Sequence, residues 1–169
     1  NKLSEDVTEM EKMLNEYLQF ASSSFSEKTE KFNISSLIDK IIKKYENKRI
    51  SSQFLNDIYM TGRKNLITRC INNLIDNAAK YANNINLQMI KSNDNIFITI
   101  DDDGPGISEK EYENVFKPFY KINKSRGDSK SSVGLGLSIA SDIIRSHGGN
   151  IALGKSPQNG LRIKISLPF

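Results

Sequence analysis

The chain has 169 residues, of which 37% are hydrophobic and 26% are charged, and its formal net charge is +4. These values suit a soluble globular protein that buries a core, and they exclude a disordered chain. No apolar run approaches the roughly 20 residues that a membrane helix needs. The positive charge is spread along the chain without a basic stripe interleaved with aromatic residues, so we expect no nucleic-acid partner. The single cysteine excludes an internal disulfide and fits a reducing compartment.

A heptad pattern opens the chain. Apolar residues follow in steps of four and three at Leu3, Val7, Met10, Leu14, Tyr17 and Ala21. This spacing predicts an amphipathic helix, and three heptads are too short for that helix to stand alone. Its seam therefore pairs with helices outside this chain or lies on the chain's own globular domain. The Ser-rich run at 22–26 predicts a linker, which places helix and linker at 1–24 and a second domain at 25–169. Because the chain begins at Asn1, we expect a fragment.

From about residue 31 onward, the pattern predicts one α/β unit. We expect strands at 32–34, within 50–60, at 85–90, 95–101, 151–153 and 161–167, and helices capped by Ser35 or Ser36, over 65–81, and over 135–147. Ser108 followed by Glu111 predicts a brief capped helix, and residues 121–133 should be mobile. Strands far outnumber simple βαβ crossovers. The expected fold is therefore an α/β two-layer sandwich, a mixed sheet with helices on one face, preceded by one amphipathic helix.

Residues 149–156 match the P-loop pattern GxxxxGK followed by Ser. That pattern binds phosphate only between a strand and a following helix. Here the four variable positions are themselves the apolar strand, and a Pro-Gln-Asn-Gly turn follows. We therefore reject a P-loop and expect Lys155 and Ser156 to be ordinary hairpin residues.

Three polar and glycine-rich clusters carry the chemistry of this chain. Asn73 and Asn77 lie four residues apart and so share one face of the predicted helix. Asp102 opens the D-x-G-x-G turn with Gly104 and Gly106 directly after a strand. The run 134–137, Gly-Leu-Gly-Leu, opens another helix, whose free N–H groups suit an anion. Neutral amides, one carboxylate and a glycine-fronted helix together can hold a magnesium-nucleotide, since Mg²⁺ prefers oxygen ligands and keeps several waters.

The chain resembles the ATP-binding domain of sensor histidine kinases, of the GHKL or Bergerat superfamily. The resemblance lies in the order of these three clusters, of the run Phe116-Lys117-Pro118-Phe119-Tyr120 between them, and of the closing hairpin. The likeness runs from about residue 31 to the end and is greatest to osmosensor-type kinases. The opening heptads resemble the second helix of the dimerisation and phosphotransfer bundle. The resemblance implies the Bergerat fold and the cofactors ATP and Mg²⁺.

The resemblance also implies roles for single residues. Asn77 corresponds to the metal ligand, and Asn73 would face the phosphates or their waters. Asp102 would accept a hydrogen bond from the exocyclic amine of adenine, which disfavours guanine. The further ATP-binding residues that it implies are Lys80, Tyr81, Gly104, Gly106, Ile107, Tyr120, Lys121, Arg126, Gly134, Leu135, Gly136 and Leu137. Lys121 and Arg126 are weighed against plain surface charge, and Tyr120 against a core role.

Two positions depart from the family pattern or from its catalytic role. Ser132 and Val133 stand where a Gly followed by Ser or Thr is common, which predicts weaker nucleotide affinity. His147, the only histidine, follows the last helix, so we expect it to complement the helix dipole rather than to accept phosphate. No phosphoacceptor is therefore expected in this chain, and none of its residues is assigned a catalytic role.

The function that the resemblance implies is transfer of the ATP γ-phosphate to a histidine on a bundle helix that this chain lacks. Its implied partners are that helix, a second protomer in a homodimer and a response regulator, in the cytoplasmic part of a bacterial inner-membrane sensor. Three alternatives remain. ATPases of the same superfamily carry a water-activating Glu where this chain has Asn73. A serine-directed protein kinase shares the fold, and a degenerate, non-catalytic dimerisation module is the third alternative.

Overall fold

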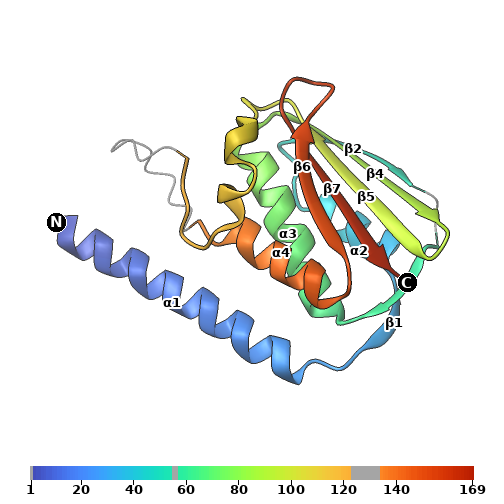
Figure 1. The fold of residues 1–169 in the computed structure, drawn as a ribbon, viewed down its shortest axis with the longest axis horizontal. Helices are drawn as coiled ribbons and strands as arrows, with labels where there is room; N and C mark the ends of the chain where they lie inside the picture. The colour runs from blue at the N-terminus through green and yellow to red at the C-terminus, as the bar shows by residue number, and fades with distance from the viewer. Residues whose placement is uncertain (1, 55–56, 123–133) are drawn as a thin grey trace.

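The computed structural model describes residues 2–54, 57–122 and 134–169. A long helix, α1 (Lys2–Ser26), precedes an α/β unit, and Figure 1 shows it standing apart from that unit. Val7, Met10, Leu14 and Tyr17 are all exposed, so this part of the apolar seam does not lie on the chain's own domain. None of the helices in the described ranges combines the length and apolar content that a membrane span needs.

The predicted linker at 22–26 is wrong, because α1 continues through it to Ser26. The hydroxyl of Ser22 donates to the carbonyl of Gln19, and that of Ser26 donates to the carbonyl of Ser22. These bonds to the preceding turn let serine remain helical. The chain leaves the helix only at residues 27–29, before strand β1.

Five strands form the main sheet in the order β2-β4-β5-β7-β6. β2 (Arg49–Phe54) runs parallel to β4 (Asn84–Ser92), whereas β5 (Asn95–Asp102), β7 (Leu161–Pro168) and β6 (Asn150–Lys155) join antiparallel. The mixed sheet is thus confirmed. A separate two-stranded sheet pairs β1 (Glu30–Asn33) with β3 (Tyr59–Gly62), so the strands predicted within 50–60 belong to two different sheets.

The helices α2 (Ile34–Ile42), α3 (Lys64–Tyr81) and α4 (Gly136–Ser146) lie over one face of the sheet (Figure 1). In β4, Ile85, Leu87 and Met89 point into the core while Gln88 and Ile90 between and beyond them are exposed. This period of two leaves the opposite face of the sheet open. The expected two-layer sandwich with helices on one face is confirmed.

Two predicted helix caps differ in the structure. Asn33, rather than Ser35 or Ser36, caps α2, with its side-chain oxygen accepting from the Ser36 N–H at 2.9 Å. The hydroxyl of Ser35 instead accepts from the N–H of Ile58. The brief helix at Ser108 is the 3₁₀ turn η1 (Glu109–Glu111), followed by η2 (Asn114–Phe116), and the Ser108 side chain makes no cap.

The rejected P-loop is confirmed as a hairpin. Residues 150–155 are strand β6, and the chain returns through a turn into β7 without a helix. Cys70 is fully buried within the core between helices and sheet.

Candidate functional site

One stripe of α3 connects the predicted residues. Asn73, Asn77 and Tyr81 succeed one another at intervals of four and therefore lie along one face of the helix, spanning about 12 Å. Residues 66, 67, 70, 71 and 74 of the same helix are buried in the core, which fixes the rotation of α3 about its own axis. Both asparagines are partly buried, and Tyr81 is exposed.

At one end of this stripe, α3 meets the start of α4. The Asn73 side-chain amide donates to the carbonyl of Gly136 at 3.4 Å. Gly136 is the first residue of α4, and the cap residue Leu135 makes no side-chain capping bond. The unsatisfied N–H groups of the first turn of α4 therefore lie beside Asn73, as an anion site requires.

Gly134 lies directly before the cap residue of α4 and contacts the backbone of Phe119 and Tyr120. Its φ is +75°, and its carbonyl accepts from the N–H of Phe119 at 3.0 Å. A Cβ at this position would lie 2.9 Å from the Tyr120 carbonyl oxygen. Gly134 is therefore required by both conformation and space. The hydroxyl of Tyr120 donates to Glu111, which raises the pKa of Tyr120, so its polar end is already bound within the protein.

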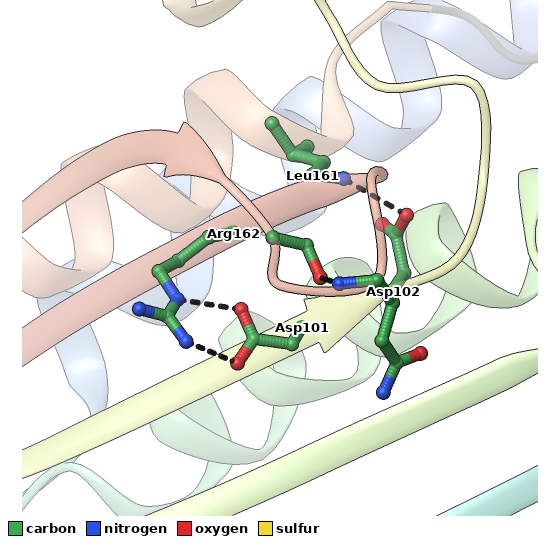
Figure 2. A network of polar contacts seen from close by, with 6 residues as sticks. Asp101, Asp102, Leu161 and Arg162 are labelled. Carbon is green, nitrogen blue, oxygen red and sulfur yellow. Dashed lines mark hydrogen bonds and ion pairs between the residues drawn. The ribbon is translucent and has the colours of Figure 1, made fainter.

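At the other end of the stripe, Asp102 leaves strand β5 with its side chain almost fully buried. Its Oδ1 accepts hydrogen bonds from two backbone N–H groups, that of Gly104 at 2.9 Å and that of Leu161 at 3.0 Å. Figure 2 shows the bond from Leu161. Among the described residues, Oδ2 has no hydrogen-bond partner. Burial raises the pKa of Asp102 above its ordinary value, against the lowering effect of these two bonds. The carboxylate is thus oriented by one oxygen and offers the other as an acceptor.

Glycines allow the backbone to close around Asp102. A Cβ on Gly104 would lie 3.0 Å from Asp102 Oδ1 and 3.1 Å from the Tyr81 carbonyl, which brings the D-x-G-x-G turn against the end of the α3 stripe. Gly106 has a φ of +69°. Gly160, in the β6–β7 turn, is closest of all, since its Cβ would lie 2.2 Å from the Asp102 backbone oxygen. Sequence reasoning missed Gly160, although its Asn-Gly turn was visible.

The two neighbours of Asp102 have structural partners. Asp101 accepts two bonds from the Arg162 guanidinium, at 2.6 and 2.7 Å, across the β5–β7 pair (Figure 2). Asp103 accepts from the backbone N–H groups of Asn83 and Asn84, which lower its pKa. Both flanking carboxylates are therefore engaged within the protein. Nothing in the sequence indicated Arg162, because the pairing of β5 with β7 decides its position.

The remaining predicted residues are placed as follows. The Lys80 ammonium lies 5.1 Å from the centre of the Tyr81 ring. Lys121 is exposed, Ile107 and Leu137 pack against the core, and Leu135 is buried. Arg126, Ser132 and Val133 lie outside the described residues.

His147 is the C-cap residue of α4, and it complements the end of that helix through a hydrogen bond rather than through a positive charge. Its Nε2 accepts from the N–H of Arg63 at 3.1 Å, and Nδ1 lies 2.7 Å from the Ile143 carbonyl. With Nε2 as acceptor, the ring is neutral and Nδ1 donates. Burial lowers the pKa of His147, which keeps it in this form.

A pocket of about 600 Å³ lies outside the α3 stripe, at the edge of β2 and β4. It is lined by Arg49, Ser51, Asp103 and Gln158 among others, and by none of the predicted nucleotide contacts. We base the candidate site on the α3 stripe because donors, acceptors and glycines converge there.

The donor set at the stripe fits Mg²⁺ rather than a softer metal. Asn77 offers a carboxamide oxygen, and its side chain makes no hydrogen bond to the described residues. Among the described residues, no group of three or more His, Cys, Asp or Glu side chains is placed so that it could hold a metal ion. Because Mg²⁺ prefers oxygen ligands and keeps several waters, one amide oxygen together with phosphate oxygens and water can hold it.

Comparisons with known proteins agree with this geometry. Residues 62–169 match the family "Histidine kinase-, DNA gyrase B-, and HSP90-like ATPase". Over 64% of its length, the chain is 37% identical to the sensor histidine kinase CpxA of Escherichia coli K12, and over 97% it is 29% identical to the sensor histidine kinase WalK of Bacillus subtilis. It spans only 24% and 29% of those relatives.

The solved structure of the mycobacterial sensor histidine kinase MprB shares the fold. It covers 83% of this chain and 97% of its own, with a TM-score of 0.73 at 23% identity. The family match includes the α3 stripe, the Asp102 turn, the start of α4 and the closing hairpin. The chain therefore belongs to the histidine kinase-, DNA gyrase B- and HSP90-like ATPase family.

Proposed function

We propose that this chain binds Mg-ATP along the α3 stripe and presents the γ-phosphate to a histidine on a bundle helix outside the chain. The observation that carries the proposal is that this one helix face spans the two glycine-rich segments, with Gly104 and Asp102 at one end and Gly136 at the other. A nucleotide laid along it has its base at Asp102 and its phosphates at the start of α4.

Each residue then has a definite task. The open Oδ2 of Asp102 accepts a hydrogen bond from the exocyclic amine of adenine. The N–H groups of Gly104 and Leu161 bind the other oxygen, Oδ1. Asn77 supplies a ligand for Mg²⁺, which neutralises phosphate charge. Asn73 and the N–H groups that open α4 orient the phosphates. Lys80, Lys121 and Arg126 would supply further positive charge to the phosphates.

An amide at position 73 supports phosphoryl transfer over hydrolysis. An amide nitrogen cannot take a proton from an attacking water, as a carboxylate does. The site would therefore hold the nucleotide until a protein acceptor arrives. We further propose that the whole protein is a homodimeric bacterial sensor kinase that carries this domain in the cytoplasm and passes phosphate to a response regulator.

Calorimetric titration with Mg-ATP and Mg-GTP tests the proposal. Asn77→Ala and Asp102→Asn should each abolish most of the binding heat. Asp102→Asn keeps an oxygen for the Gly104 and Leu161 N–H groups and replaces only the open acceptor. Asn72→Ala, on the same helix but outside the stripe, is the matched control and should bind ATP normally. Equal binding of ATP and GTP would contradict the assignment of Asp102.

Radiolabelled ATP tests whether this chain only donates the phosphate and a histidine outside the chain accepts it. The chain alone should acquire no label, and a polypeptide that carries the acceptor helix should become labelled when it is added. Label on His147 would refute the proposal, because that ring is engaged on both nitrogens.

A further inference from the structure

Glu27, the first residue after α1, binds backbone N–H groups in the first turn of α3. Oε1 of Glu27 accepts from the N–H of Asn65 at 2.6 Å, and Oε2 accepts from the N–H of Leu66 at 3.1 Å. A helix usually satisfies such groups with its own cap residue. The cap residue of α3, Arg63, makes no side-chain capping bond. The first turn of α3 is therefore capped from another part of the chain.

A second distant residue completes this arrangement. His147, at the end of α4, accepts from the N–H of Arg63, and the Arg63 guanidinium donates to Ser146 at 2.6 Å. The end of α1, the beginning of α3 and the end of α4 thus meet at one point. Both α3 and α4 lead from this point towards the candidate site, to Asn73 and to Gly136.

The contact matters because α1 has little else to fix its direction. It packs extensively against none of the described helices or strands, and only residues 27–29 separate it from β1. Next to Glu27, the ion pair of Glu30 with Lys64 is long, at 3.9 Å, and both side chains are about half exposed, so it contributes little. Glu27 makes two hydrogen bonds, at 2.6 and 3.1 Å, and its negative charge lies at the positive end of α3.

We infer that Glu27 is a positioning residue that fixes the direction in which α1 leaves the ATP-binding domain. Its carboxylate joins the last turn of α1 to the helix that carries Asn73 and Asn77. Any rotation of α1 that moves Glu27 must break the capping bonds of α3. If the proposed function holds, this contact sets how often an acceptor carried by the α1 bundle meets the γ-phosphate, as orientation does in other two-site reactions.

Spin-label distances measured by pulsed electron paramagnetic resonance test this inference directly. Labels are placed on Leu14→Cys in α1 and Lys164→Cys on the open face of the sheet, both exposed positions. Cys70 needs no replacement, because burial raises the pKa of its thiol to about 12. Labelled protein is diluted with unlabelled protein, which removes distances between copies.

The parent protein should give one narrow distance distribution. Glu27→Ala should broaden it, and the fraction outside the parent peak should rise about fivefold, as expected for loss of one helix cap. Glu27→Gln, which keeps the shape without the charge, should lie between the two. Glu30→Ala is the matched control and should leave the distribution narrow. If Glu27→Ala does not fold, as judged by circular dichroism, Glu27→Gln decides.

An unchanged distribution in the Glu27 variants, or equal broadening in Glu30→Ala, overturns the inference. Mg-ATP affinity, measured on the same samples, should stay within about twofold of the parent, since Glu27 touches no proposed nucleotide ligand. Absence of ATP binding in every sample would refute the proposed function and leave the distance result valid. In the full-length protein, phosphotransfer should slow about fivefold with KM for Mg-ATP unchanged.

Discussion

The orientation of the buried Asp102 carboxylate is fixed by its hydrogen bonds. Two backbone N–H groups bind the same oxygen, so the side chain cannot rotate without losing both. The price of its burial is a raised pKa, offset in part by these bonds. The second oxygen therefore points in a fixed direction with its acceptor capacity intact, which is what recognition of one hydrogen-bond donor requires.

Arg162 lies beside this carboxylate and should stabilise the fold through Asp101. Arg162→Met leaves the buried Asp101 without its paired donors and should lower the free energy of unfolding by about 2 kcal/mol. Urea unfolding at pH 7 measures this loss. Adding Asp101→Asn to the variant should recover about half of it, because the uncompensated charge is removed. Full stability of the single variant would show that the ion pair contributes nothing.

Gly160 provides the second residue-level prediction. Its missing Cβ would lie 2.3 Å from Asp102 Oδ1, and the neighbouring backbone cannot give way. Gly160→Ala should cost about 2 kcal/mol in unfolding free energy and should also displace the carboxylate, lowering ATP affinity about tenfold. Gly154→Ala, in β6, is the control, since its nearest neighbour is the Arg162 Cβ at 4.0 Å. Similar behaviour of the two variants in chemical unfolding and calorimetry would contradict the packing argument.

At the level of elements, α3 and α4 depend on contacts from outside their own sequence. Glu27 and His147 bind N–H groups at the beginning of α3, and the Asn73 side chain reaches the beginning of α4. Neither helix is therefore held at its ends by local sequence alone. A residue at the end of α4, His147, binds the beginning of α3, and a residue of α3, Asn73, binds the beginning of α4.

The His147 contact makes stability depend on pH. Because burial lowers the pKa of His147 in the folded protein, the unfolded chain takes up a proton first as the pH falls. Stability from this group is complete above about pH 6.5, the ordinary histidine value, and is lost as the pH falls from there towards the lower folded-state pKa. Urea unfolding at pH 7.5 and pH 5.5 should show this loss. His147→Gln should reduce the pH dependence, and an unaltered slope would assign it to other groups.

At the scale of the whole molecule, nucleotide binding should stabilise the ATP-binding domain. A ligand present at 100 times its Kd contributes about 2.7 kcal/mol, provided that the unfolded chain does not bind it. For a domain of this size, the expected rise in Tm is about 5–10 °C with Mg-ATP. Differential scanning fluorimetry measures it, with Asn77→Ala as the variant that should not respond. The absence of any shift in the parent would favour the degenerate, non-catalytic alternative.

Much of this molecule was predictable because its signals are local. The alternation in β4 and β5, the helix over 65–81 and the D-x-G-x-G turn depend on side-chain period and on glycine at short range, and all three are present as expected. The i, i+4 spacing of Asn73 and Asn77 likewise placed them on one helix face. These features follow from backbone geometry that the sequence alone determines.

Tertiary structure decided which strands pair and which side chains connect the helices, strands and turns. Strand β2 paired in parallel with β4 rather than with its neighbour β3, which no local pattern could distinguish. The partners of Asp102, Asp101 and Asn65 are Leu161, Arg162 and Glu27, each at least 38 residues away. Such contacts depend on how strands and helices pack over long chain separations, where many pairings satisfy the same hydrophobic pattern. The sequence thus determined the chemistry of the site, and packing determined its orientation.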